Sequence, residues 1–379
     1  MSDVYRSVTN RSLGDNLIDS VKGMLVGAVL FAVAFPLLWW NEGRTDISGV
    51  AKKAVVVSAT ATSSTGEGKL VSITGELKPD GTLADPDFLK PGAWTRLRRE
   101  VEQFAWVESK ATKTEKKLGG GSQEITTYTY DQKWTQSPRD ADDFAHPEGH
   151  ANPKLDVSGR TFYAPHANVG LYGFAPEDIE LPPARPITLT AELLASSAFK
   201  KTGDYLYRGK GSADAPRLGD VRVSFSALES GRRVTAYGQR QGTSIVPYLH
   251  EGKDKLYRVV DGTHEEAIAT LHGEHTTTTW ILRLVGFLFM WFGMALVLGP
   301  INAVLDIVPF IGSTGRALTG VALFPIALVL SGITVLTAIV AHNPILLLFV
   351  VAAVIGGAAF FIQRRATAKK ARGAVKMAA

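Results

Sequence analysis

Four long apolar segments divide this chain, and their placement constrains its architecture more than any other feature. The first covers residues 23–40, and the other three lie near the C-terminus, at 280–301, 317–341 and 344–362. Each is about 18–25 residues long and nearly uncharged, which is enough for a helix to cross ~30 Å of hydrocarbon. We therefore predict four transmembrane helices, one N-terminal and three C-terminal.

The polar sequence between the first two segments, residues 41–279, has the composition of a soluble domain. Several stretches alternate β-branched or aromatic residues with polar ones, as half-buried strands do. The clearest begin at Lys53, Lys69, Glu124 and Asp220, and turn residues separate them. The sequence therefore predicts an α+β membrane protein with a large β-rich extramembrane domain.

Three local patterns in this domain give sharper predictions. Glu229-Ser230-Gly231 between two strand patterns predicts a β-hairpin. Residues 94–112 alternate as a strand does, although their Arg-rich start leaves a helix open. Thr263 with Glu266 forms a capping-box pattern, so we expect a helix to begin there and to continue into the second span.

The C-terminal tail predicts the orientation in the membrane. Residues 363–379 carry six basic side chains and no acidic one, which exceeds the formal net charge of +5 for the whole chain. Basic residues beside a span favour the cytoplasmic side, and they attract anionic lipid. With four spans, the N-terminal residues 1–22 and the apolar loop 302–316 then also lie in the cytoplasm, and the large domain lies outside it. Apolar residues continue past the only signal-peptidase-like pattern, so an uncleaved anchor is favoured over a signal peptide.

Composition and motifs argue against several classes of function. The chain has no cysteine, which excludes disulfides, thiolate metal sites and cysteine nucleophiles. It contains no nucleophile elbow, phosphate loop or dinucleotide fingerprint, and no basic–aromatic pattern typical of nucleic-acid binding. We therefore expect no enzyme, no catalytic residue, no cofactor and no nucleic-acid partner.

Histidines are the only candidates for a metal site. His272 and His275 are three residues apart and could face one ion on a helix. His146, His150 and His166 lie in a proline-rich segment and could converge. Solvated or loop histidines are the simpler interpretation of both groups, so we predict no metal.

Two groups of residues are candidates for structural roles in or beside the membrane. Asn41, Glu42, Gly43 and Arg44 follow two tryptophans at the end of the first span. A helix stop at the membrane surface explains these residue types. Alternatively, Glu42 or Arg44 makes a charge-assisted bond, with Arg283 as the candidate partner of Glu42, that fixes the external domain on its membrane base.

Small residues repeat at four-residue spacing in the fourth span, where Ala352 pairs with Gly356 and Ala353 with Gly357. This spacing lets two helices approach closely. Packing within one chain and association between chains explain it equally well.

Four stretches together resemble the transmembrane-protein-43 (LUMA) family. They are NEGR (residues 41–44), YTYDQKWTQSPRDADDFAHPEGHANP (128–153), RLGDVRVSFSAL (217–228) and ILRLVGFLFMWFGMALVLGPINAVLDIVPFIGS (281–313). The resemblance covers nearly the whole chain in order. In the C-terminal half of the bundle it rests on hydropathy alone.

This resemblance implies a four-span protein with a large lumenal or periplasmic domain and no enzymatic activity. Eukaryotic members are linked to the endoplasmic reticulum and inner nuclear membrane, to self-association and to binding of envelope proteins. Many Ala and Gly and no Cys favour a bacterial relative, with its domain in the periplasm and its spans in the inner membrane. We therefore predict a homo-oligomeric membrane scaffold that binds envelope proteins. The alternative is an ion channel or transport component formed by the three C-terminal spans.

Overall fold

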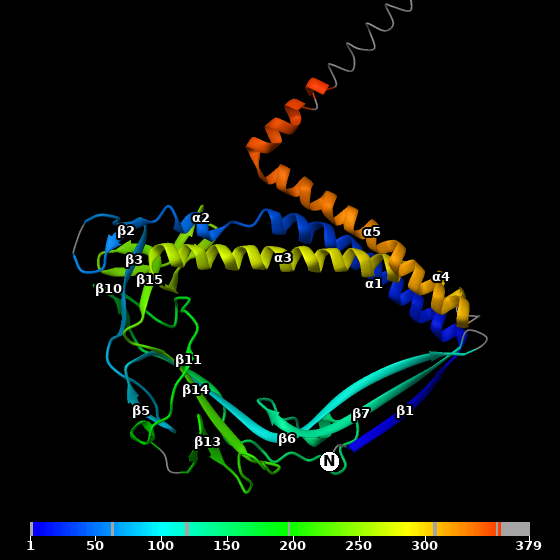
Figure 1. Ribbon diagram of the computed structural model, residues 1–379, viewed down its shortest axis with the longest axis horizontal. Coiled ribbons are helices and arrows are strands. Elements are labelled where there is room, and N and C mark those ends of the chain that lie inside the picture. Colours follow the sequence, from blue (N-terminus) through cyan, green and yellow to red (C-terminus); the bar gives the residue numbers. More distant parts are fainter. Residues whose placement is uncertain are drawn as a thin grey trace, which may run out of the picture. The chain divides into compact units, whose positions relative to one another are not determined.

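The computed structural model describes residues 3–61, 64–117, 121–195, 198–305, 309–353 and 355–357. Its contacts divide the chain into two compact units. We call the first the β-rich unit; it consists of Met1–Asn10, Asp46–Glu115 and Gln123–His275. The second, the helical unit, consists of Arg11–Thr45, Lys116–Ser122 and Thr276–Ala379. Figure 1 shows the elements of both.

The first large sheet contains eight strands and holds one hydrophobic core of the β-rich unit. Its main path pairs β1 (Asp3–Arg11), β7 (Ser122–Thr135), β6 (Trp94–Lys116), β14 (Val221–Glu229), β13 (Tyr205–Arg208) and β12 (Lys200–Thr202) in that order. β8 (Arg160–Tyr163) pairs with β6, and β11 (Arg185–Pro186) with β14. Every second residue of β6 is buried from Leu97 to Ala105, which resolves the ambiguous segment 94–112 as a strand.

The second large sheet contains seven strands around a separate core. Its path is β19 (Arg258–Asp261), β15 (Arg233–Gln241), β16 (Ser244–Val246), β10 (Tyr172–Phe174), β9 (Ala167–Val169), β3 (Leu70–Pro79) and β2 (Val55–Ser58). β15 also pairs with β3, so five of these strands form a closed circuit of pairings. Two small hairpins complete the β structure: β4 (Leu83–Asp85) with β5 (Leu89–Gly92), and β17 (Tyr248–His250) with β18 (Asp254–Leu256). The β-rich domain expected from the alternating pattern is present.

The predicted hairpin at Glu229-Ser230-Gly231 is wrong. The chain does turn there, with Gly231 at φ +88°, but β14 joins the eight-stranded sheet and β15 the seven-stranded one. Turn residues specify a local change of direction and not the strand that will pair across it. Here the residues between the strands carry the chain from one sheet to the other.

The N-terminal residues form a strand that the sequence did not predict. Asp3–Arg11 forms β1, the edge strand beside β7 (Figure 1), whereas the cytoplasmic location predicted for residues 1–22 stays a prediction. Ser12 then caps α1 (Leu13–Glu42) through a capping box with Asp15, so the helix begins ten residues before the apolar segment. Residues 3–10 thus belong to the β-rich unit.

A short helix, α2 (Ile47–Ala51), follows α1 outside the apolar segments. Three helices overlap the C-terminal apolar segments, with different bounds: α3 (His264–Val297), α4 (Gly299–Leu305) and α5 (Pro309–His342). The capping box at α3 is confirmed: the Glu266 carboxylate accepts from Thr263 N at 2.7 Å, and Thr263 Oγ1 accepts from Glu266 N at 3.3 Å. The expected loop 302–316 is largely helical, because α4 includes its start and α5 begins at Pro309.

Among the described residues, three helices are long and apolar enough to cross a membrane: α1, α3 and α5. A shorter apolar helix covers Pro344–Gly357, and residues 358–362 of the expected fourth span lie outside the described residues. The basic tail 363–379 lies outside them as well. The count of four spans therefore stays a prediction.

Candidate functional site

The end of α1 and the start of the membrane part of α3 are joined by an ion pair inside the helical unit. Arg283 donates from Nε to Glu42 Oε1 at 2.8 Å and from Nη2 to Glu42 Oε2 at 2.7 Å. This two-pronged geometry is the strong form of an arginine–carboxylate bond. Glu42 is 5% exposed, and the Arg283 guanidinium also lies 4.8 Å from the centre of the Trp280 ring. The structure thus brings together the acid and the base of the sequence hypothesis.

Asn41 and Gly43 close the same end of the bundle. The buried Asn41 donates from Nδ2 to the carbonyl of Thr279 at 3.2 Å, a second link between α1 and α3. A Cβ on Gly43 would lie 2.5 Å from the ring of His342 in α5, so a larger residue there would require this ring to move. These contacts make the Asn41-Glu42-Gly43 sequence a junction of three helices in addition to a helix stop.

Arg44 takes a different position from Glu42. Its guanidinium lies 5.8 Å from the centre of the Trp40 ring, within range of a cation–π contact. Glu42 and Arg283 both belong to the helical unit, so their bond fixes one helix to another. Whether it also fixes the external domain on its membrane base stays a prediction.

The small residues of the expected fourth span are not packed against another described helix. Ala352, Ala353, Gly356 and Gly357 are exposed, and a Cβ on either glycine would meet nothing within 4 Å in the described part of the chain. Close packing occurs instead between α1 and α3, where a Cβ on Gly27 would lie 2.6 Å from the carbonyl oxygen of Gly293. This contact was not predicted from the sequence, although the four-residue spacing of Gly23 and Gly27 is a signal for it.

Two of the histidines considered for a metal belong to an aromatic cluster in the β-rich unit. The buried His150 stacks on Tyr130, with ring centres 4.0 Å apart, and His146 stacks on Tyr5 of β1 at 4.4 Å. Tyr130 donates to Glu108 and accepts from His146 N at 2.9 Å. Burial, followed by the Glu108 carboxylate, raises the pKa of Tyr130 to about 12. The cluster ties the proline-rich segment and β1 to β7.

The ring nitrogens of His150 both face acceptors. Nδ1 lies 2.9 Å from the carbonyl oxygen of His146, and Nε2 lies 3.3 Å from the carboxylate of Asp3. Both bonds form when the ring carries two protons, because each nitrogen is then a donor. In that form His150 clamps the first residues of β1.

The juxtamembrane motif His272-Gly273-Glu274-His275 makes polar contacts with two other segments. His272 Nδ1 lies 3.3 Å from Asp46, and Glu274 accepts two bonds from Arg258, at 2.6 and 2.8 Å. Burial works against ionisation of Asp46, but bonds from Ser48 and His272 hold its pKa below the usual value. Among the described residues, no group of three or more His, Asp or Glu side chains is arranged to hold a metal ion.

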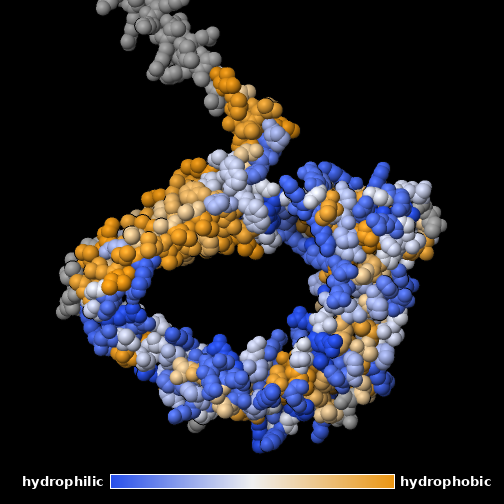
Figure 2. Space-filling model, turned by 180° about the vertical axis from the view of Figure 1, so that it is seen from behind, coloured by the Kyte–Doolittle hydropathy of each residue, from blue (hydrophilic) through white to orange (hydrophobic). Residues whose placement is uncertain are grey.

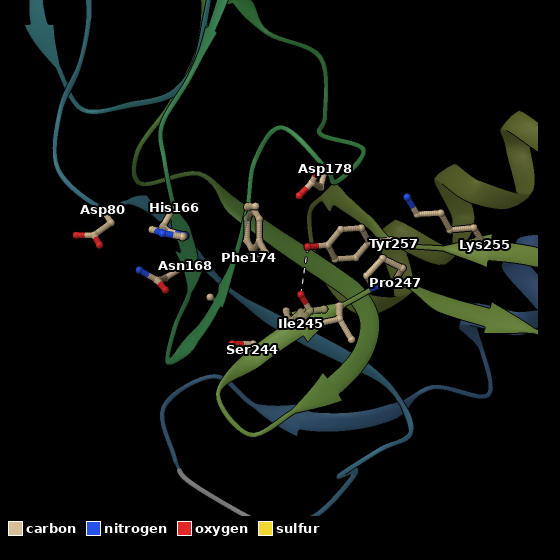
Figure 3. Close-up of a pocket in the computed structure, with 13 residues that line it drawn as sticks. Asp80, His166, Asn168, Phe174, Asp178, Ser244, Ile245, Pro247, Lys255 and Tyr257 are labelled. Carbon is tan, nitrogen blue, oxygen red and sulfur yellow. Dashed lines mark hydrogen bonds between the residues drawn. The ribbon is translucent and has the colours of Figure 1, made fainter.

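The seven-stranded sheet carries an open cavity of about 610 Å³ that the sequence did not predict (Figure 3). Asp80, His166 and Asn168 lie on one side of it and Asp178 and Lys255 on the other. Its centre is more apolar, with Phe174, Ile245 and Tyr257, whose hydroxyl donates to the Ile245 carbonyl at 3.1 Å. Burial and the Asp178 charge raise the pKa of Tyr257, so its hydroxyl stays neutral. Such a lining can bind a small polar group.

The helices present a different surface. Apolar side chains cover the face of the helices that Figure 2 shows, and only 17% of the most apolar window of each long helix is buried within the chain. A surface of this size requires lipid or other protein around it. These features define an integral membrane protein of the α+β class, with long apolar helices and a large β-rich domain.

Comparison with known sequences identifies the family. Residues 103–344 match the family described as Transmembrane protein 43, and the chain belongs to that family. It is 28% identical to transmembrane protein 43 of Rattus norvegicus and 27% identical to that of Homo sapiens, each over 314 residues and 78% of both chains. The homologue of Drosophila melanogaster is 25% identical over 295 residues, covering 75% of this chain and 78% of that protein. No solved structure matches the chain.

Proposed function

We propose that this protein is a non-enzymatic membrane scaffold that self-associates through its apolar helices and binds envelope proteins through its β-rich domain. The proposal rests on a difference between the two units: the surface of the helical unit is apolar, whereas the β-rich unit buries its apolar side chains in its own cores. The helical unit exposes apolar side chains such as Leu348 and Phe349, about 70% exposed, whereas the described residues of the β-rich unit gather their buried apolar side chains in three cores. A rigid polar domain on a membrane anchor suits binding and positioning.

Self-association is best tested at the glycines of the fourth apolar segment. Because a Cβ on Gly356 or Gly357 meets nothing within the described part of its own chain, larger side chains there should leave the single chain folded. We expect Gly356→Leu with Gly357→Leu to shift full-length protein in detergent from oligomer to monomer, as measured by native mass spectrometry. Gly332→Leu in α5, also open within the chain, is the matched control. A wild-type monomer at all concentrations would contradict the proposal.

The competing function is a channel or transport component. Ser331, Thr334 and Thr337 are hydroxyl residues of α5, and each donates to a carbonyl of its own helix, at 3.0, 2.8 and 2.8 Å. A hydroxyl that donates in this way keeps its acceptor lone pairs for water, so these three residues are the candidates in α5 for lining an aqueous path. Ion flux through reconstituted protein, abolished by changes in α5, would favour this alternative over scaffolding.

The proposed location is the inner membrane of a bacterium, with the β-rich domain in the periplasm and the basic tail in the cytoplasm. Since the chain has no native cysteine, single cysteines report position cleanly. We expect Ser137→Cys to react with an impermeant maleimide in spheroplasts and Ala378→Cys to react only after permeabilisation. The reverse pattern would overturn the orientation.

A further inference from the structure

The cavity of the seven-stranded sheet opens where two of its strands diverge. β10 and β16 run parallel and pair at one position, Gly173 with Ser244. Pro247, directly after β16, has no N–H to donate, so the pairing cannot continue. The Ile245 carbonyl accepts from the Tyr257 hydroxyl at 3.1 Å. The opening is therefore part of the fold, and its volume of about 610 Å³ is in the range of small-ligand sites.

The floor of the cavity is apolar and aromatic. Phe174, Ile245 and Tyr257 line it, and all three are buried (Figure 3). The bond from its hydroxyl to Ile245 holds the Tyr257 ring in place. The ammonium group of Lys255 lies 5.4 Å from the centre of this ring, in cation–π range. The floor thus already attracts one cation, which comes from the chain itself.

The rim of the cavity is rich in hydrogen-bond acceptors. Asp80 lies on one side and Asp178 on the other (Figure 3), and among the described residues neither carboxylate forms an ion pair. A Cβ on Gly173 would lie 2.9 Å from Asn168 Oδ1, so this amide oxygen lies over the floor. Two carboxylates outnumber the single ammonium group of Lys255. The lining therefore favours a cationic ligand that carries several donors.

We propose that this cavity binds an aliphatic amine with an ammonium group at each end. One ammonium group lies beside Asp80 and the other beside Asp178, and the methylene chain between them crosses the aromatic floor. An ammonium group has three donors and no acceptor, which matches carboxylate and amide oxygens. The methylene chain loses contact with water over apolar side chains, which is favourable. This ligand site is independent of the scaffold role.

Lys255 distinguishes this ligand from an anion or a zwitterion. Its ammonium group repels a bound cation and competes with it for the Tyr257 ring. Lys255→Ala should therefore tighten the binding of a polyamine, by about twofold or more. A ligand with its own carboxylate would lose a partner in this variant and would bind more weakly. A residue needed only for folding would not improve binding when it is removed.

Isothermal titration calorimetry of the full-length protein in detergent tests the proposal, with spermidine as the probe. We expect spermidine to bind about fivefold or more tightly than butylamine, which has one ammonium group and meets one carboxylate. Asp80→Asn and Asp178→Asn should each weaken spermidine binding about two- to fivefold, because both carboxylates are exposed. Asp204→Asn, on the exposed turn between β12 and β13, is the matched control and should bind as the wild type does.

Three results would overturn the proposal. They are equal affinities for spermidine and butylamine, unchanged binding in both cavity variants, and weaker binding in Lys255→Ala. A lysine-rich peptide that binds where spermidine does not would also overturn it, and would assign the cavity to a side chain of a partner protein. Equal thermal unfolding of wild type and variants shows that the exposed substitutions leave the fold intact. The oligomeric state of the protein does not enter any of these comparisons.

Discussion

Arg283 of α3 forms a two-pronged ion pair with Glu42 at the end of α1, with nitrogen–oxygen distances of 2.8 and 2.7 Å. The pair joins residues that are 241 positions apart, and the carboxylate is almost fully buried. Removing either charged side chain leaves the other charge poorly hydrated and without a partner. This loss of stability exceeds what the bond contributes when it forms.

We expect Glu42→Ala to lower the thermal stability of the helical unit and Glu42→Arg with Arg283→Glu to restore part of it. The loss should fall below the about 3–5 kcal/mol of fully buried pairs, because Arg283 is 24% exposed. Thermal unfolding in detergent, read as a double-mutant cycle, measures the coupling. Additive effects of the two single changes would show that the pair does not stabilise the fold.

The contact between Gly27 and Gly293 gives a packing prediction. A Cβ on Gly27 would lie 2.6 Å from both the Gly293 carbonyl oxygen and Leu296 Cβ, so Gly27→Val forces α1 and α3 apart. We expect a loss of about 1–3 kcal/mol, typical of overpacking. Gly332→Val, in open space on α5, is the control and should unfold at the wild-type temperature.

Asp220 predicts a pH dependence of stability. Burial would raise its pKa, but bonds from the Tyr207 hydroxyl and the backbone N–H groups of Lys210, Gly211 and Arg217 hold it below the usual value. A depressed carboxylate pKa stabilises the fold above the unfolded value, about 3.9, and the contribution is lost as the pH falls through the folded-state value.

Asp220→Asn should therefore cost about 1.5–3 kcal/mol at pH 7, because an amide N–H₂ replaces an acceptor facing several donors. The difference from wild type should shrink as the pH falls below about 4. Urea unfolding at several pH values measures it, and Tyr207→Phe, which removes one of the bonds, should show a smaller effect. An unchanged difference at low pH would contradict the argument.

The hydroxyl of Tyr130 gives a prediction about how much the aromatic cluster contributes to the free energy of unfolding. Tyr130→Phe leaves the His146 N–H without its acceptor and removes one of the two donors to Glu108, whose carboxylate keeps the bond from Ala145 N, so we expect a loss of about 1–3 kcal/mol in the stability of the β-rich unit. Tyr128→Phe, on the same strand and only partly buried, is the control. Equal urea midpoints for the two variants would show that the hydroxyl of Tyr130 contributes nothing.

The composition of single segments was enough to predict much of this molecule. Apolar runs identified the long helices, period-2 alternation identified strands such as β3, β6 and β14, and Thr263 with Glu266 marked the start of α3. Each of these signals is local: it depends on the residues within one turn or one strand, where backbone geometry fixes which side chains share a face.

Contacts between residues distant in sequence could be found only from the tertiary structure. The Glu42–Arg283 bond is the exception: because few charged residues lie near the membrane, the sequence offered few possible partners for Glu42. Nothing local distinguishes Asp3–Arg11 as a strand of the distant sheet, or separates β14 from β15 after a turn typical of hairpins. The cavity at Asp178 and the contact of Gly27 with Gly293 likewise join segments from different parts of the chain. Alternation fixes which face of a strand is buried, but only the packing of whole sheets and helices decides what covers that face.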